Sequence, residues 1–464
     1  MYEFKVLVLD KAIIFTLKIM KIRNVFSAVM LSLSLSAFAQ DEKAPVVGTL
    51  DIDLAKAIEI ALDENPTIRV ADQDIELKKV ADKEAWQNLL PSLTADLTLS
   101  HSIQVAAIKT QMGEFKMGMD GSTTAMGAIN LQLPIFAPAV YQNMKLTKED
   151  IMLAQEKARG SRLDLVKQVT KAYYAALLAK DSYEVMLKSQ KVSEDNFKVV
   201  SDKLAVGKVS EYDKISADVQ RRSMNSAVVS AEAGVQLAVL QLKVLMGVTE
   251  NVAINIKDQL RNYESQMTLA ATEAGLSELD NNTNLKQLDF NAQQLRRARK
   301  LLHTNFMPTV GMQLSYQYSS YSNSNWNIFK YHFSPSSTLA FAVSVPIYKA
   351  SNWTKLKSNT IQQQQLRETR DNTVRQLRLA VESYRENMTK TIAQAESNRE
   401  AIRQATKAVD IMAKRYEVGH GTILELNQSE TALTQTELTY NQSIYEFLTN
   451  KADLDYTLGR EREQ

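Results

Sequence analysis

The spacing of hydrophobic residues changes from helical to strand-like and back within each half of the chain. In the second half, apolar residues recur every three or four positions from Leu285 to Leu302, which indicates an amphipathic helix. From Val310 to Tyr318, and again from Leu339 to Val345, apolar and polar residues alternate, as is typical of strands with two different faces. Helical spacing then returns and continues towards the C-terminus. This pattern predicts a helix, two strands and a long helical region.

The first half of the chain repeats the pattern of the second. Asn65–Ser100 aligns without gaps on Asn282–Gln317, with identical Asn, Asp, Lys and Pro positions. The chain has only 14 Gly and 8 Pro, so their recurrence at matching places indicates two copies of one unit. The short motifs that also recur are Pro134-Ile135-Phe136 with Pro346-Ile347-Tyr348, and Val206-Gly207 with Val418-Gly419.

The long helical region of each copy has one clear break. No Gly or Pro occurs from Ile347 to Val418. An uninterrupted helix of about 65 residues would be roughly 100 Å long at 1.5 Å per residue. The first break comes at Gly207 or Gly419, where helical spacing resumes within a few residues. We therefore predict a tight helical hairpin at each glycine.

These patterns divide the chain into five segments. We expect repeat 1 over 65–248 and repeat 2 over 282–464, with an N-terminal segment at 40–64 and an inter-repeat segment at 249–281. Residues 1–39 form an N-terminal extension and signal peptide. The strands are expected at about 92–106, 124–136, 309–321 and 336–347.

The N-terminal segment carries an export signal. A basic stretch at Met20–Arg23 precedes an apolar stretch at Val25–Leu35, and Ala37-Phe38-Ala39 matches the small-residue cleavage pattern of secretory signal peptides. A single N-terminal membrane anchor is the alternative, although the apolar stretch is short for a membrane span. Residues 1–19 are unusual ahead of such a signal and suggest an over-assigned start codon.

Composition excludes several kinds of chemistry. The chain has no Cys, so disulfides, thiolate metal sites and a cysteine nucleophile are excluded. Its 55 Lys+Arg against 53 Asp+Glu give a net charge of +2, which argues against nucleic-acid binding. The four His are scattered, and no hydrolase, metalloprotease or phosphate-loop motif occurs. We expect no enzymatic activity, no cofactor and no metal site.

The alternating segments are long enough to cross a bilayer as tilted strands. Ten of the 33 aromatic residues fall between Phe306 and Tyr348, which suits an aromatic girdle and a surface loop. Four strands cannot close a membrane barrel, so the chain must oligomerise to span. Two copies give eight strands and three give twelve, and the strand count does not choose between them. The edge of a soluble β-sandwich is the alternative.

The chain resembles the TolC-type outer-membrane efflux and secretion channels from about Leu50 to Gly459. The motifs that carry the resemblance are Leu54-Ala55-Lys56-Ala57-Ile58 with Asn65-Pro66, Leu89-Leu90-Pro91-Ser92-Leu93, Leu133-Pro134-Ile135-Phe136, Ala172-Tyr173-Tyr174 and Arg415-Tyr416-Glu417-Val418-Gly419. The fold implied is mainly α with transmembrane β. It has two internal repeats, each of long helical hairpins plus a β-hairpin, and a homotrimeric twelve-stranded barrel continued by a periplasmic helical barrel.

The resemblance also implies a location, a role and partners. It places the protein in the outer membrane of a Gram-negative bacterium, in contact with outer-membrane lipid. It implies a passive exit duct for small molecules or polypeptides that works with a periplasmic adaptor protein and an inner-membrane transporter of the RND or ABC type. No nucleic acid is implied as a partner.

Several positions match functional residues of that family. By resemblance, the turns Val206-Gly207 and Val418-Gly419 contact the adaptor, Asp213 and Tyr416 help to close the tip, and Glu425 and Gln428 occupy a pore constriction. Gly421 stands where the family has a gate Arg, and Gln428 where it has a second acid. The alternative readings are plain turn glycines and a solvated helix-surface Glu425.

Four prolines are expected where strand meets helix in both copies. Proline lacks an N–H and biases the preceding residue towards extended angles, which suits the end of a regular element. We interpret these prolines as the junction between barrel and tunnel: Pro91, Pro134, Pro308 and Pro346. The rival class of protein is a secreted or periplasmic coiled-coil scaffold whose strands merely cap its helices.

Overall fold

A computed structural model describes residues 49–110, 113–116, 120–248, 252–270, 279–322 and 331–461. The predicted signal peptide and the extension before it lie outside these residues. The chain divides into two units, residues 1–50 with 250–254 and residues 51–249 with 255–464. Apart from Val252, the described residues of the first unit belong to two short strands, β1 (Thr49–Ile52) and β6 (Ala253–Ile256), which pair with each other. The second unit contains the rest of the fold.

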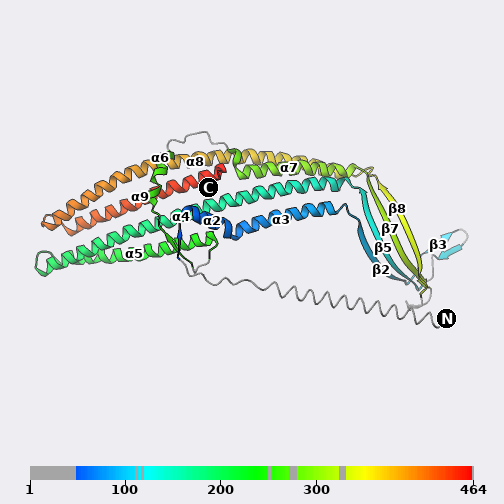
Figure 1. The fold of residues 1–464 in the computed structure, drawn as a ribbon, viewed down its shortest axis with the longest axis horizontal. Helices are drawn as coiled ribbons and strands as arrows, with labels where there is room; N and C mark the ends of the chain where they lie inside the picture. The colour runs from blue at the N-terminus through cyan, green and yellow to red at the C-terminus, as the bar shows by residue number, and fades with distance from the viewer. Residues whose placement is uncertain are drawn as a thin grey trace. The chain divides into compact units, whose positions relative to one another are not determined.

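The second unit consists of two copies of one arrangement of helices (Figure 1). In the first copy α3 (Pro66–Gln87) precedes α4 (Pro138–Ala205) and α5 (Glu211–Met246). In the second copy α7 (Thr283–His303) precedes α8 (Ala350–Glu417) and α9 (Ile423–Leu458). Both α4 and α8 have 68 residues, and both α5 and α9 have 36. The prediction of a mainly helical protein with two repeated halves is confirmed.

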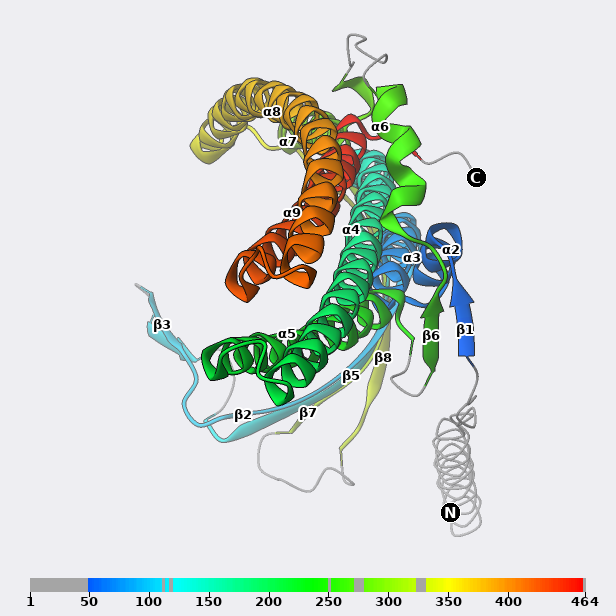
Figure 2. The ribbon, with the colours of Figure 1, turned by 90° about the vertical axis from the view of Figure 1, so that its left-hand side faces the viewer.

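Shorter elements surround these helices. Helix α2 (Leu54–Glu64) packs on α4, and Figure 2 shows α2 and α6 on the same side of α4. The remaining short elements are η2 (Leu260–Tyr263), α6 (Glu264–Ala270), η3 (Leu279–Asn281), η4 (Thr304–Phe306), β3 (Ala107–Thr110) and β4 (Gly113–Lys116). The hairpin of β3 and β4 was not expected from the spacing of hydrophobic residues.

One antiparallel sheet of four strands follows the ends of α3 and α7. Its strands are β2 (Ser92–Ser102), β5 (Ser122–Phe136), β7 (Thr309–Ser322) and β8 (Ser334–Ser344), in the order β2-β5-β7-β8. Each repeat supplies two neighbouring strands, and β5 pairs with β7 across the repeats. Within the described chain, β2 and β8 are therefore edge strands with one side unpaired.

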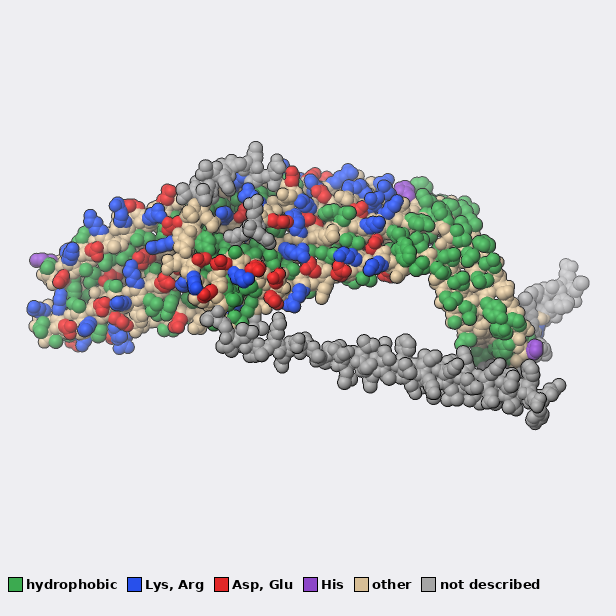
Figure 3. Space-filling view, in the orientation of Figure 1, with side chains coloured by type: hydrophobic (Ala, Val, Ile, Leu, Met, Phe, Trp, Pro, Cys, Tyr) green, Lys and Arg blue, Asp and Glu red, His purple; other side chains and the backbone are tan. Residues whose placement is uncertain are grey.

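The two faces of this sheet differ in polarity. The register aligns Leu93, Leu131, Leu314 and Leu339 in one row across the strands, and directly paired residues share a face. The next row contains Thr94, Asn130, Ser315 and Thr338 and lies on the opposite face. Figure 3 shows uncharged side chains over the sheet, whereas Lys, Arg, Asp and Glu cover the helices. The alternation read in the sequence thus produces one apolar and one polar face.

The hydrophobic core includes large side chains of α4, α5 and α9, and α4 packs against both α5 and α9. Tyr173, Leu177, Met246, Ile444 and Phe447 are all fully buried. Burying one large apolar side chain contributes roughly 1.5–3 kcal/mol. This core joins the two repeats because α4 belongs to the first and α9 to the second.

The segment between the repeats is fastened to this core by polar contacts. The Tyr173 hydroxyl donates to Asp258 at 2.8 Å, and the Leu260 N–H donates to the buried Asp181 carboxylate at 2.9 Å. Burial raises the pKa of Asp181. Tyr440 of α9 donates to Glu264 at the start of α6, and burial together with this contact raises the pKa of Tyr440 to about 12.

In both repeats, the end of the helical hairpin contacts the asparagine that precedes the first helix of the repeat, α3 or α7. The Asn65 side-chain amide donates to the Leu245 carbonyl at 2.7 Å, and the Asn282 amide donates to the Thr457 carbonyl at 2.7 Å. Beside them, Gly247 and Gly459 end α5 and α9 with φ of +70° and +65°. A Cβ on Gly459 would lie 2.0 Å from the Asn281 carbonyl oxygen, so the backbones meet too closely for any side chain.

Gly459→Ala should therefore destabilise the protein by at least about 1–2 kcal/mol, because alanine is strained at positive φ and also meets backbone here. Gly234→Ala is the matched control, since Gly234 lies within α5 with open space at its Cβ position. The measurement is the thermal unfolding midpoint of the detergent-solubilised protein by circular dichroism. Equal midpoints for the two variants would contradict the close approach.

Candidate gate at the hairpin tips

The two hairpin turns have the same local structure. After α4 and α8 the chain turns at Gly207 and Gly419, with φ of +69° and +83°. The Lys208 N–H donates to the Lys203 carbonyl and the His420 N–H to the Arg415 carbonyl, both at 2.9 Å. Such bonds satisfy the last carbonyls of a helix. The structure thus gives both predicted turns a local, backbone reason for glycine.

Each turn exposes one apolar side chain. Val206 and Val418 precede the two glycines and are 67% and 66% exposed. They line one groove between the two turns, together with Gly207, Gly419 and Asp213. The four predicted adaptor-contact residues are therefore brought together on one surface by the repeat.

The helix that follows each turn begins with a reciprocal cap. Ser210 Oγ accepts from the Asp213 N–H at 3.2 Å, and Asp213 Oδ2 accepts from the Ser210 N–H at 2.9 Å. Thr422 and Glu425 make the same pair of bonds at 3.2 and 3.0 Å. Asp213 and Glu425 are thus equivalent capping residues of the two repeats. The Asp213 carboxylate is bound by Ser210, and its charge acts on Tyr416 only at longer range.

A small apolar cluster holds the two hairpins together just behind the turns. Tyr416 packs there with Val200, Ala217, Ile423 and Leu426, and all five are buried. The buried Tyr416 hydroxyl has no hydrogen-bond partner among the described residues. Burial raises the pKa of Tyr416, and the negative charge of Asp213 adds to the effect. Tyr416 therefore acts through packing in this structure.

Lys203 is a tip residue that the sequence patterns did not single out. Its Nζ donates to the Tyr416 carbonyl at 3.1 Å and lies 4.4 Å from the centre of the Tyr416 ring. It thereby caps the C-terminal end of α8 from the neighbouring hairpin, where a positive charge is favourable. The only sequence signal was a basic residue in the last turn of a predicted helix. This contact joins the two repeats at the tip.

The constriction candidates Glu425 and Gln428 are both exposed on α9. A hydrogen bond from the Thr422 N–H holds the pKa of Glu425 below its usual range, and the positive charge of Arg415 adds to this. Glu425 is therefore ionised at neutral pH. Gln428 lines a second groove between α5 and α9, beside the exposed apolar residues Ile215, Val219 and Leu424.

Further from the tip, a hydrogen bond to a buried carboxyl group joins the two repeats. Asn196 of α4 donates its amide to Glu430 of α9 at 2.7 Å, and Glu430 is 9% exposed. Burial raises the pKa of Glu430, although the Asn196 contact opposes the shift. This polar pair was missed by sequence reasoning because its members lie 234 residues apart.

The four prolines lie at the opposite end of the long helices. Pro91 and Pro308 directly precede β2 and β7, and Pro346 lies between β8 and α8. Pro134 lies within β5, next to a shift of register between Pro134 and Phe136. Such irregular strand positions tolerate a residue without an N–H.

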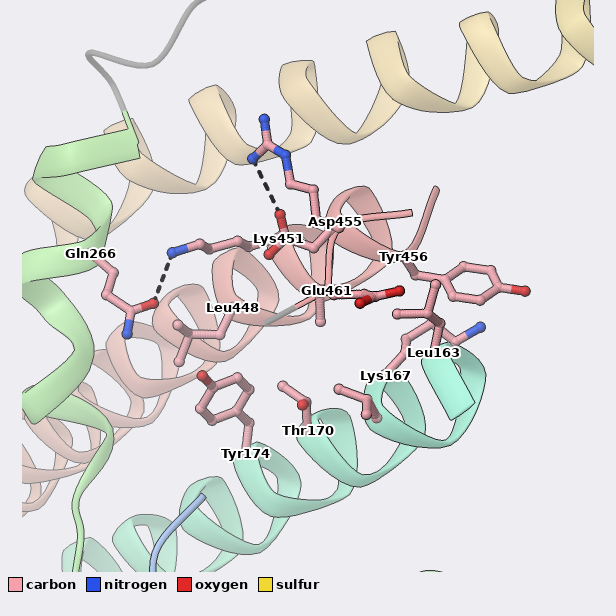
Figure 4. A pocket seen from close by; sticks show the side chains of 13 residues that line it. Leu163, Lys167, Thr170, Tyr174, Gln266, Leu448, Lys451, Asp455, Tyr456 and Glu461 are labelled. Carbon is pink, nitrogen blue, oxygen red and sulfur yellow. Dashed lines mark hydrogen bonds and ion pairs between the residues drawn. The ribbon is translucent and has the colours of Figure 1, made fainter. Parts of the chain in front are cut away.

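A further pocket between α4 and α9 offers little to a ligand. Figure 4 shows Lys451 directed towards Gln266. Lys451 donates to Gln266 at 3.0 Å, Arg460 pairs with Asp455 at 3.4 Å, and Lys167 lies 3.9 Å from the centre of the Tyr456 ring. Elsewhere in the described part of the chain, no group of three or more His, Asp or Glu is placed to hold a metal ion.

Comparison with solved structures identifies the fold. The CusC channel structure superposes with a TM-score of 0.70 at 15% identity, covering 91% of this chain and 96% of CusC. The Campylobacter jejuni CmeC outer membrane channel gives 0.66 at 14% identity, covering 88% and 85%. At such identities the similarity concerns the fold, which is that of outer-membrane channels.

The chain belongs to the outer membrane efflux protein family, whose sequence model matches residues 57–248 and 276–460. It is 21% identical over 439 residues to the alkaline protease secretion protein AprF of Pseudomonas aeruginosa, covering 94% of this chain and 87% of AprF. It is 23% identical over 456 residues to outer membrane protein TolC of Salmonella enteritidis, covering 94% and 86%. The protein is accordingly located in the outer membrane, as predicted.

Lys203→Met should loosen the tip, because it removes the cross-repeat cap while keeping most of the apolar stem. The chain has no Cys, so Ala217→Cys provides a single buried thiol in the tip cluster. We expect maleimide to label this thiol severalfold faster in the Lys203→Met background. Lys208→Met, which changes an exposed lysine of the same turn, is the control. Equal labelling rates in the wild-type, Lys203→Met and Lys208→Met backgrounds would show that Lys203 does not hold the tip together.

Glu430 should make stability fall as pH rises. Because its folded-state pKa is raised, its stabilising contribution is complete below the unfolded value near 4.5 and is lost as pH rises through the folded-state pKa. Glu430→Gln keeps an oxygen acceptor for Asn196 and removes the titration. We expect a higher unfolding midpoint at neutral pH and a flatter midpoint-against-pH profile above pH 4.5 than in wild type. A variant with an unchanged profile would show that Glu430 does not titrate in this range.

Proposed function

We propose that three copies of this chain form a passive exit duct through the outer membrane. Three four-stranded sheets would close into a twelve-stranded barrel, and the long helices would continue it as a periplasmic tunnel. In this proposal the repeats span 65–248 and 282–464, with 40–64 as an N-terminal periplasmic segment and 249–281 as an inter-repeat equatorial segment. The observation that carries the proposal is the amphipathic sheet with two unpaired edges.

The sheet argues for closure between copies. In a bilayer, each unpaired N–H or C=O group costs several kcal/mol. The free sides of β2 and β8 are such edges, and pairing β2 of one copy with β8 of the next satisfies both. The apolar face would then contact lipid and the polar face would line water. The Tyr316 and Tyr318 side chains lie on the apolar face, where an aromatic girdle is expected.

The helices also lack lateral partners in a single chain. Helix α5 is the one described helix long and apolar enough to cross a membrane by length and composition, yet only 11% of that apolar stretch is buried. Val219, Leu237 and Val244 lie along one face of α5 and are each more than half exposed. A neighbouring copy that covers this stripe gives the helical tunnel its lateral contacts.

Family membership supports the proposed partner proteins, a transporter and an adaptor. TolC is an outer membrane protein and AprF is an alkaline protease secretion protein, so members of this family serve export. For this chain we propose an inner-membrane transporter of the RND or ABC type as the source of energy. A periplasmic adaptor would bind the exposed Val206-Gly207 and Val418-Gly419 turns. Cargo could be small molecules or polypeptides.

The tip would gate the duct. Three Glu425 carboxylates around the axis would favour cations, with Gln428 one turn further along the helix, and Asp213, Tyr416 and Lys203 would hold the hairpins closed. Pro91, Pro134, Pro308 and Pro346 would mark the junction of barrel and tunnel. No step in this function uses a cofactor or a covalent reaction.

The alternative is a secreted or periplasmic coiled-coil scaffold. It requires the sheet to remain outside any bilayer, although one of its faces is largely apolar. Native mass spectrometry of the detergent-extracted protein separates the two, because the duct requires a trimer whose gel migration changes on heating. A detergent-independent monomer would favour the scaffold.

Glu425→Gln should lower the preference of reconstituted channels for K⁺ over Cl⁻ by roughly twofold or more, because the charge is lost. Glutamine can still serve in the reciprocal cap, so helix α9 should start normally. Glu417→Gln, which removes an exposed carboxylate before the turn, is the control. Reversal potentials in a KCl gradient across planar bilayers measure the effect. Unchanged selectivity would show that Glu425 acts only as a helix cap.

A further inference from the structure

Asp96 is an isolated charge in the sheet. Within the four strands Ser92–Ser102, Ser122–Phe136, Thr309–Ser322 and Ser334–Ser344, it is the single acidic residue, and there is no Lys or Arg. The Asn130 amide donates to Asp96 Oδ2 at 2.7 Å, so its position is fixed by the adjacent strand. The strands otherwise consist of apolar and uncharged polar residues.

The register places Asp96 on the polar face. Asp96 pairs with Ala128, Ala128 pairs with Gln317, and Gln317 pairs with Ser336, so these four form one row. The rows on either side belong to the apolar face, at Ala95 and Leu97. A carboxylate on the lipid side would be costly, whereas a water-filled interior accepts it. The single charge of the strands thus lies on the face that water would line.

Asp96 lies near the middle of its strand rather than at either end. Asp96 is the fifth residue of β2, so it lies about 13 Å along the strand from Ser92 at roughly 3.3 Å per residue. The glutamates of the tip lie beyond helices of 68 residues, which measure about 100 Å. A charge at Asp96 therefore acts on solutes well apart from the tip.

We propose that Asp96 determines the charge selectivity of the barrel interior, as one of three symmetry-related carboxylates in an otherwise uncharged wall. The inference rests on the trimeric duct proposed above, in which each copy contributes one Asp96 to the same row. The ring attracts cationic solutes and disfavours anions as they leave through the barrel. Because water fills a wide interior, salt screens the effect: the Debye length is about 10 Å at 0.1 M and about 3 Å at 1 M.

The test uses purified full-length protein in planar bilayers with a KCl gradient. Asp96→Asn should lower the K⁺ to Cl⁻ permeability ratio by roughly twofold in 0.1 M salt, with little change in 1 M salt. The Glu425→Gln background, in which the Glu425 charge is absent, should show the same change. Asp96→Glu should retain the wild-type ratio, and Thr98→Asn, an uncharged change on the same face, is the matched control.

A second variant leaves Asp96 in place. Gln317→Lys puts a positive charge in the same row of the sheet and should lower the ratio at least as much as Asp96→Asn does. If wild type conducts and neither variant changes the ratio in 0.1 M salt, the Asp96 proposal is wrong and the duct stands. If wild type never conducts in any condition, the duct itself is wrong, and the Asp96 proposal falls with it.

Discussion

The unpaired edges of a four-stranded sheet are the constraint on which the rest of this structure depends. Backbone N–H and C=O groups cannot remain unsatisfied in hydrocarbon, and β2 and β8 each present a row of them. A single chain cannot remove both edges while its sheet stays open. The same chain also leaves an apolar stripe exposed along α5. In the proposed duct, neighbouring copies cover the strand edges and the helix faces for different physical reasons, and one cyclic assembly does both.

Because the chain is duplicated, its two halves are nearly alike. Helices of 68 and 36 residues recur, and so do the Asn65/Asn282 contacts, the Gly247/Gly459 turns and the Ser210/Thr422 caps. The copies differ where they meet at the tip. Lys203 reaches across to the end of α8, whereas the Arg415 guanidinium donates to the His420 carbonyl of its own turn at 3.1 Å. The two hairpins thus share one architecture, while Lys203 gives the first of them a cross-repeat contact that the second does not reciprocate through Arg415.

Charge is distributed unevenly along the proposed path of a solute. The helices are covered by both signs of charge, whereas the strands hold one carboxylate, Asp96. At the tip, Asp213 and Glu425 serve first as caps that satisfy backbone N–H groups at the starts of α5 and α9. The bond from the Thr422 N–H holds the Glu425 carboxylate in place and lowers its pKa, so local helix chemistry also fixes a negative charge at the tip.

The sequence by itself determined the long helices and the four main strands, the duplication and the positions of the turns, because these follow from short-range periodicity and from glycine and proline chemistry. Leu285–Leu302 lies in α7, and the alternation at Val310–Tyr318 and Leu339–Val345 lies in β7 and β8, continuing one residue beyond β8. Family motifs pointed to Tyr416 and Glu425. Only the tertiary structure decided what these residues touch: Tyr416 is packed without a hydroxyl partner, Glu425 is a cap, and Lys203 and the Asn196–Glu430 pair join helices over 200 residues apart. Spacing along the chain carries no information about such contacts, since they depend on how two hairpins pack. The faces of the strands were readable from alternation, but the row that contains Asp96 and Gln317 required the register, which hydrogen bonding between distant strands fixes.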